Sequence, residues 1–72
     1  MTRLQIAVAG TGLMGRRHME LVEANASCEL SAIVDPAPRA VAIAERVGVR
    51  LYRSLEELFN AGCPDGVILA TP

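Results

Sequence analysis

The 72-residue sequence contains no lysine and no tryptophan, and it has only one tyrosine, one phenylalanine and two cysteines. All seven basic residues are arginines, so no amine side chain can act as a neutral base or form a Schiff base. Aromatic side chains are too few for stacking on nucleic acid bases to be a main function. Lysine-dependent covalent chemistry and base stacking are therefore not expected of these residues.

The sequence also lacks a strong charge of one sign and a long apolar run. The formal net charge is −1 and the arginines are spread along the chain, which does not fit a nucleic acid partner. No apolar run approaches the roughly 18 residues of a membrane-spanning helix, so no membrane partner is expected. Residues 1–9 do not resemble a signal peptide. We expect a cytoplasmic protein in which Cys28 and Cys63 are reduced thiols, without a metal site.

A glycine-rich segment at residues 10–15 directly follows an apolar run at residues 4–9. It consists of Gly10, Thr11, Gly12, Leu13, Met14 and Gly15. In this pattern the first glycine permits a tight turn, the second lets a pyrophosphate approach the backbone, and the third brings the following helix close to the sheet. The free N–H groups of Leu13 and Met14 would point at the phosphates. The segment predicts a dinucleotide-binding turn.

An acidic residue, Asp35, follows Gly15 by about 20 residues, the spacing typical of dinucleotide sites. It ends a second apolar run at residues 30–34, where its carboxylate can accept hydrogen bonds from both hydroxyls of the adenosine ribose. A 2′-phosphate about 4 Å away would cost up to about 4 kcal/mol at an effective dielectric constant near 20. This favours NAD over NADP, although Arg39 could turn toward a 2′-phosphate and leaves NADP possible.

The periodicity of apolar residues predicts alternating strands and helices in an α/β fold. Because the strands are apolar and each is followed by a helix, they should form a parallel sheet in the order 3-2-1-4, a partial Rossmann fold with flanking helices. Ser54 and Glu57 form an expected capping box, and Gly48 an expected helix end. The predicted strands are residues 4–9, 30–34, 49–52 and 66–70, and the predicted helices are residues 13–24, 39–47 and 55–60.

Apolar spacing also predicts the buried side of the first two helices. In residues 13–24 these are Met14, His18, Leu21 and Val22, and in residues 39–47 they are Val41, Ala44 and Val47.

Several features have a simpler interpretation. Glycine-rich turns also occur in flavin sites, S-adenosylmethionine sites and purely structural sheets. Asp35 could be the N-cap of the next helix, His18 a packed structural histidine and Arg39 a solvated surface residue.

The segment from Gly10 to His18 resembles the GxGxxGxxH opening of the Gfo/Idh/MocA oxidoreductases. Residues 33–35 with Ala40, Ala44 and Gly48 are similar to that family's second strand and helix. Residues 52–58 resemble its Y-x-s/d-l-e-e-l segment, and residues 67–72 resemble its strand ending in Ala-Thr-Pro. The resemblance spans the whole chain.

The resemblance implies a nicotinamide-dependent oxidoreductase that transfers hydride to or from a sugar, cyclitol or related polyol and assembles as a homo-oligomer. Carried over from the family, the cofactor-binding residues are Gly10, Gly12, Leu13, Met14, Gly15 and Asp35, with Thr71 near the nicotinamide. Thr11 in the turn and Arg39 near Asp35 are further expected cofactor-binding residues. The family's Glu-Lys-Pro motif, whose lysine assists proton transfer, would lie past residue 72. No catalytic residue can therefore be named.

We expect residues 1–72 to be the N-terminal part of a dinucleotide-binding domain, truncated and without its substrate domain, with weak NAD binding and no turnover alone. The alternative is a stand-alone nucleotide-binding or dimerisation module without catalysis, self-associating through the edge of the fourth strand. A third possibility is a folding fragment without function. The gene sequence downstream of Pro72 would distinguish the first two.

Overall fold

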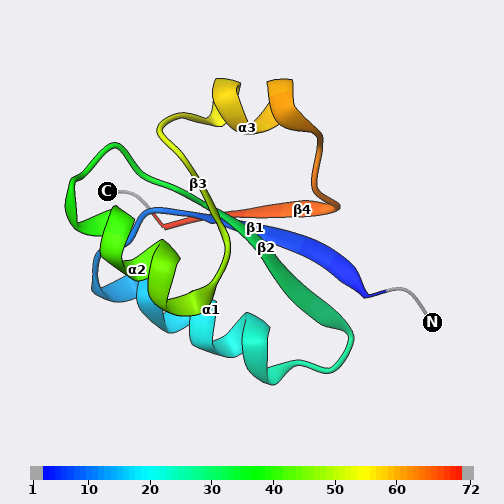
Figure 1. Ribbon diagram of the computed structural model, residues 1–72. Coiled ribbons are helices and arrows are strands. Elements are labelled where there is room, and N and C mark those ends of the chain that lie inside the picture. The colour runs from blue at the N-terminus through cyan, green and yellow to red at the C-terminus, as the bar shows by residue number, and fades with distance from the viewer. Residues whose placement is uncertain (1–2, 71–72) are drawn as a thin grey trace.

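The computed structural model describes residues 3–70, which form a four-stranded sheet with three helices (Figure 1). All strand pairs are parallel and the strand order is β3-β2-β1-β4. The α/β fold and the strand order predicted from the sequence are confirmed. In chain order the elements are β1 (Leu4–Ala9), α1 (Leu13–Ala24), β2 (Cys28–Val34), α2 (Arg39–Val47), β3 (Arg50–Tyr52), α3 (Leu55–Ala61) and β4 (Gly66–Leu69).

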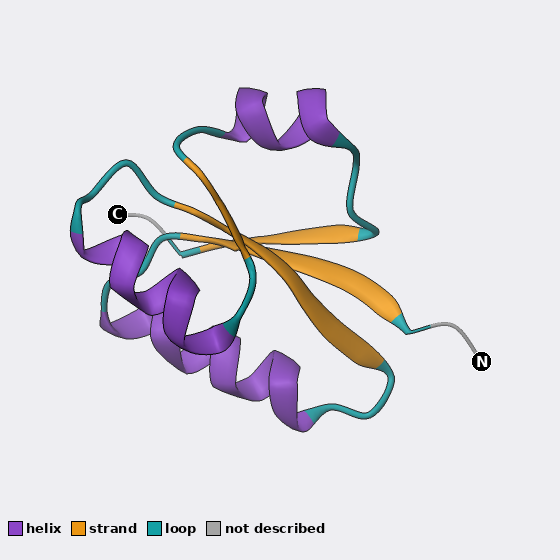
Figure 2. Cartoon of the chain, in the orientation of Figure 1, coloured by secondary structure: helices purple, strands orange, loops and turns teal. Residues whose placement is uncertain are grey.

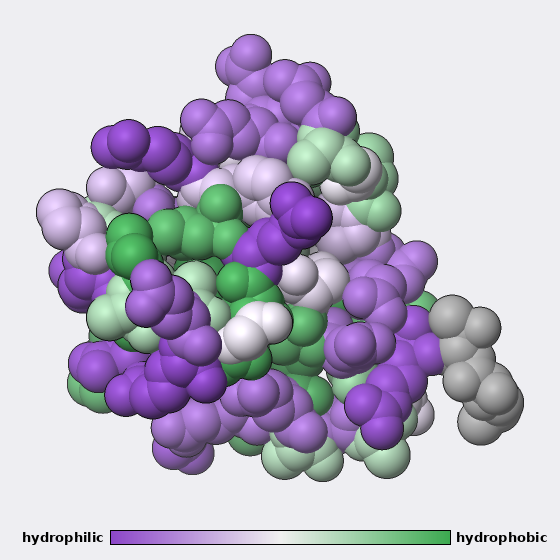
Figure 3. Space-filling model, viewed as in Figure 1, coloured by the Kyte–Doolittle hydropathy of each residue, from purple (hydrophilic) through white to green (hydrophobic). Residues whose placement is uncertain are grey.

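The helices lie on both faces of the sheet, with α1 and α2 on one face and α3 on the other (Figure 2). The face under α1 and α2 carries the larger side chains, including Val8, Ile33 and Ile43. The face under α3 is lined mainly by alanines and valine, which pack against Leu58. Figure 3 shows apolar side chains gathered between α2 and α3 on the viewed face, with polar side chains around them.

A register shift in the middle of β2 keeps the apolar side chains before and after it on the same face of the sheet. Ile6 pairs with Leu30, whereas the next residue, Ala7, pairs with Ala32, so Ser31 is the extra residue of a β-bulge. Because successive side chains of a strand alternate between faces, this bulge leaves Leu30 on the same face as the more distant Ile33. The two core layers thus stay apolar on both sides of the irregularity.

The predicted buried side of α1 is only partly correct. Val22 is buried as predicted and His18 is half-buried, but Met14 and Leu21 are exposed. The residues that face the sheet are Gly15, Met19 and Val22. Gly15 lies against the end of β1, and residues four and seven positions later share its side of the helix, which fixes the rotation of α1.

The buried side of α2 differs from the prediction in a similar way. Ala44 is buried as predicted, but Val41 is exposed and Val47 only partly buried. The helix buries Ala40, Ile43 and Ala44, a spacing of three and four residues, and Ile43 and Ala44 belong to the core that covers this face of the sheet.

The hydrogen bonds and dihedral angles at the helix ends agree with those predicted from the sequence. The N–H group of Glu57 donates to the Ser54 hydroxyl oxygen at 3.2 Å, so Ser54 is the N-cap of α3 as predicted. The Glu57 carboxylate accepts from the N–H group of Arg53 at 3.0 Å, one residue before the capping residue itself. Gly48 ends α2 in the left-handed conformation with φ of 74°, also as predicted. β2 begins at Cys28, two residues before the start predicted from the sequence, because Cys28 pairs with Leu4 of β1.

Between residues 3 and 70 no helix is long and apolar enough to cross a membrane. Cys28 is partly buried and Cys63 exposed, and both are free thiols.

Candidate cofactor site

The glycine turn lies at the carboxyl edge of the sheet, between β1 and α1. Gly10 has φ of 109°, which only glycine adopts readily, and its N–H group donates to the Val34 carbonyl oxygen at 2.8 Å. This hydrogen bond places the turn beside the end of β2. The chain therefore reverses immediately next to the residue that follows β2, Asp35.

Gly15 and Gly12 meet different requirements in this turn. A Cβ atom at Gly15 would lie 1.9 Å from the Gly10 carbonyl oxygen, so only glycine fits. At Gly12, which has an ordinary φ of −70°, the nearest atom to such a Cβ is Nη2 of Arg39 at 3.9 Å. The space above Gly12 is open and can admit a ligand to the backbone.

The N-terminus of α1 opens onto this space. Gly12 is the N-cap and provides no side-chain hydrogen bond, and the first turn of α1 contains no acidic residue. The N–H groups at the start of a helix lack intrahelical acceptors and carry partial positive charge. Those of Leu13 and Met14, whose side chains are exposed, can therefore bind an anion such as a pyrophosphate.

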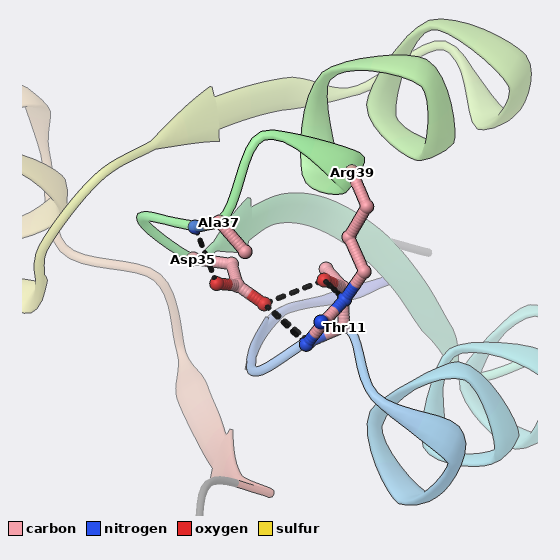
Figure 4. Close-up of polar contacts among 4 residues, drawn as sticks. All are labelled: Thr11, Asp35, Ala37 and Arg39. Carbon is pink, nitrogen blue, oxygen red and sulfur yellow. Dashed lines mark hydrogen bonds and ion pairs between the residues drawn. The ribbon is translucent and has the colours of Figure 1, made fainter.

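Asp35 is buried, with 8% of its surface exposed, and it is held by three hydrogen bonds (Figure 4). Its Oδ2 atom accepts from the Thr11 N–H group at 2.7 Å and from the Thr11 hydroxyl at 2.5 Å. Its Oδ1 atom accepts from the Ala37 N–H group at 2.8 Å. The carboxylate is thus fixed between the glycine turn and the segment that leads into α2.

Arg39, in the first turn of α2, reaches back over this pair. Its Nε–H group donates to the Thr11 hydroxyl oxygen at 3.2 Å, and its Nη2 atom lies 3.7 Å from Asp35 Oδ2. The arginine side chain remains 60% exposed, so this ion pair is partly screened by water. Arg39 is a solvated residue that also contacts the site.

These contacts determine the protonation of Asp35. Burial alone raises the pKa of this carboxyl group, but the hydrogen bonds from Thr11 and Ala37 and the charge of Arg39 outweigh burial and lower the pKa below its ordinary value. Asp35 is therefore a carboxylate at neutral pH.

Asp35 is not the N-cap of α2, which is Pro38, but its Oδ1 atom accepts from the N–H group two residues later in the segment that leads into this helix. His18 is half-buried and lines an apolar groove of about 430 Å³ between α1 and β4 together with Leu21 and Ile68. Thr71 lies outside the described residues.

Thr11 is the residue whose contribution the sequence did not reveal. Its position within the turn suggested cofactor binding, but it is fully buried and its hydroxyl bonds to Asp35. The sequence feature that corresponds to this contact is the hydroxyl side chain at position 11, between the first two glycines of the turn.

A glycine turn at the carboxyl edge of a parallel sheet, an open helix N-terminus and a carboxylate at the end of the next strand define a dinucleotide-binding Rossmann domain. Residues 4–72 match the GFO_IDH_MocA family, described as "Oxidoreductase family, NAD-binding Rossmann fold". The chain belongs to this family, and the resemblance predicted from the sequence is confirmed.

Individual relatives agree with this assignment. The chain is 37% identical over 71 residues to an inositol 2-dehydrogenase of Leifsonia xyli, covering 96% of this chain and 21% of that protein. It is 31% identical over 72 residues to the rhizopine catabolism protein MocA of Rhizobium meliloti, covering 100% of this chain and 23% of that protein. The crystal structure of GenD2 from gentamicin A biosynthesis, in complex with NAD, superimposes with a TM-score of 0.88 at 34% identity, covering 100% of this chain and 21% of that one. The chain thus spans less than a quarter of the length of these relatives.

Proposed function

We propose that residues 1–72 are the cofactor-binding part of an NAD-dependent dehydrogenase, and that the substrate domain lies in another part of the protein. The observation that carries this proposal is the fixed Asp35 carboxylate beside an open glycine turn. Bound NAD would supply the hydride acceptor for oxidation of the substrate. These residues would bind and orient the cofactor, and proton transfer would need groups elsewhere.

In this proposal each part of the site has its own task. The backbone of Gly10, Gly12 and Gly15, with the N–H groups of Leu13 and Met14, holds the pyrophosphate. Asp35 accepts a hydrogen bond from the adenosine ribose and repels a 2′-phosphate, which favours NAD over NADP.

Arg39 would lie near the ribose, and Thr71 would lie near the nicotinamide. Thr11 would support Asp35 from within the turn.

We infer that the substrate is a polyol, a sugar or a cyclitol. The support is the match to an inositol 2-dehydrogenase and to solved dehydrogenases such as WlbA of Bordetella pertussis, determined with NADH and UDP-GlcNAcA. We further propose a cytoplasmic location, which suits the two free thiols, and a homo-oligomeric enzyme.

Isothermal titration of the protein, as its gene encodes it, with NAD and NADP tests the cofactor assignment. NAD is expected to bind at least tenfold more tightly than NADP. Asp35→Asn should weaken NAD binding by roughly tenfold or more and narrow the difference between the two cofactors. Binding of neither cofactor would contradict the function, and equal or tighter binding of NADP would contradict the role of Asp35.

A second candidate function, association between copies of the chain, rests on β4. Within the described residues β4 pairs with β1 on one side only, and Leu69 near its end is 66% exposed. An open strand edge with an exposed leucine favours pairing with a second copy. Sedimentation velocity of wild type and Leu69→Lys tests this, because a lysine on an edge strand opposes pairing. A monomeric wild type would exclude the candidate.

A further inference from the structure

The apolar groove between α1 and β4 leaves one layer of the core open. Ile6 and Ile68, which line it from the sheet, pack against the core under α1 but are only partly buried. Leu21, which lines it from α1, is 56% exposed. Within residues 3–70, the core layer under α1 is therefore incomplete at β4.

The strand connections show which segment can fill this groove. α1 and α2 lead from β1 to β2 and from β2 to β3, and both lie on the groove face (Figure 1). α3 leads back from β3 to β4 and lies on the other face, as right-handed crossovers require. A helix that leads from β4 to a further parallel strand at its open edge runs in the same direction as α3 and shares its face. A segment that fills the groove is therefore not the helix directly after β4.

His18 is a polar side chain of this groove without a partner. It is half-buried, and in the part of the chain that the structure describes no hydrogen bond or ion pair involves its imidazole ring. Asn25, which also lines the groove, already accepts at Oδ1 from the Ser27 N–H group at 2.8 Å. An apolar segment packed over His18 would remove water from the ring, and an imidazole N–H group is costly to bury unpaired. The covering segment therefore needs an acceptor at this position.

We propose that a helix of the same protein, from outside residues 1–72, docks in the groove between α1 and β4 and accepts a hydrogen bond from the His18 imidazole at a side-chain or terminal carbonyl oxygen. A helix fits because α1 and α2 already form a helical layer on this face. The chain spans less than a quarter of the relatives it matches, so a protein of their length has ample chain for this helix. The inference rests on the proposed function only in placing the substrate domain in the same protein. His18 is then a positioning residue between the cofactor-binding part and the rest of the protein.

Photo-cross-linking identifies the segment in the groove. The photoreactive residue p-benzoylphenylalanine replaces Leu21 in the protein as its gene encodes it, and mass spectrometry identifies the linked peptide. The expected product is a cross-link within one chain to a peptide more than about 20 residues beyond β4, since a crossover and its strand take at least that length. A cross-link between two copies, a cross-link to the segment directly after β4, or no cross-link outside residues 1–72 would overturn the proposal.

Leu21→Glu and Val41→Glu are a matched pair that tests whether the groove is covered. The two side chains are 56% and 51% exposed within the described residues, and both lie on helices of the same face. Leu21→Glu should lower the midpoint of thermal unfolding by about 5 °C or more, because it places a charge in a buried contact. Val41→Glu should change the midpoint by less than about 2 °C. Equal shifts would show that nothing covers Leu21 and would overturn the docking site.

Variants of His18 separate a hydrogen bond from simple packing. His18→Leu keeps an apolar side chain and removes the donor, so the midpoint of thermal unfolding should fall by about 3 °C or more. His18→Asn or His18→Gln, which place an amide N–H group near the position of Nδ1 or Nε2, should restore at least half of this loss in one of the two variants. Wild-type stability of His18→Leu, or no rescue by either amide, would overturn the role of His18.

Cofactor titration keeps this inference apart from the proposed function. The affinity for NAD should stay within about twofold of wild type in the His18 variants, because His18 lies outside the cofactor site. A larger loss of affinity would overturn the assignment of His18 to the docking site. Failure of the wild type to bind NAD or NADP would overturn the proposed function alone, because neither the cross-link nor the stability shifts depend on the cofactor.

Discussion

The Cα atom of Gly15 faces the carbonyl oxygen of Gly10 so closely that an added Cβ would lie 1.9 Å from that oxygen. The first turn of α1 is therefore in direct backbone contact with the end of β1. This contact sets the rotation of α1 and also the position of the open helix N-terminus.

Gly15→Ala is expected to destabilise the fold by about 3 kcal/mol or more, because neither the Gly10 backbone nor the packed helix can move easily. Urea denaturation followed by circular dichroism measures the loss in free energy of unfolding. A change below about 1 kcal/mol would show that α1 can shift without cost.

Gly12→Ala is the matched control and a prediction in itself. The added methyl group meets nothing closer than 3.9 Å and the φ of −70° suits alanine, so the free energy of unfolding should stay within about 0.5 kcal/mol of wild type. NAD affinity should fall by roughly tenfold or more, because the methyl group occupies the path of the pyrophosphate to the backbone. Retained affinity would place the phosphates elsewhere.

The lowered pKa of Asp35 predicts a pH dependence of stability. Since its pKa in the folded state lies below the unfolded value of about 3.9, its contribution is fully present above that value. It is lost as the pH falls through the folded pKa. Urea denaturation between pH 7 and pH 2 should show this loss below about pH 4.

Asp35→Asn should reduce this acid-induced loss, whereas Glu45→Gln, which removes an exposed carboxylate from α2, should leave it in place. Identical acid profiles for Asp35→Asn and wild type would contradict the assignment.

Ser54→Ala should destabilise the protein by about 1 kcal/mol, because the N–H group of Glu57 loses its acceptor at the start of α3. Ser54→Asp, which offers another good capping oxygen, should restore most of the loss. Thermal unfolding of the two variants beside wild type measures both effects. Equal stability of Ser54→Ala and wild type would show that the cap contributes nothing here.

The sequence predicted the fold well because its signals are local. The glycine turn, the capping serine at Ser54 and the left-handed Gly48 each depend on a few neighbouring residues, and all three are found in the structure. The strand order followed from the right-handed crossover rule.

The predictions from the sequence were wrong where they concerned the packing of one element against another. The exposed Met14 and Val41 fit a helical apolar stripe. The rotation of α1 is set instead by the contact of Gly15 with Gly10, and α2 buries Ile43 in the core against the sheet. The hydrogen bonds that hold Asp35 Oδ2 both come from Thr11, which lies 24 residues earlier in the chain. No local pattern contains that information.

The bulge at Ser31 has a consequence for the tolerance of β2 to changes in length. Removing one residue from a buried strand normally turns every following side chain to the opposite face. Here Ser31 has no partner residue in β1, so deletion of Ser31 would convert the irregular strand into a regular one. Leu30 and Ile33 would still share a face, and Asp35 would still arrive beside the glycine turn. We therefore expect deletion of Ser31 to leave the core and the site in place, which urea denaturation of the shortened protein beside wild type would measure.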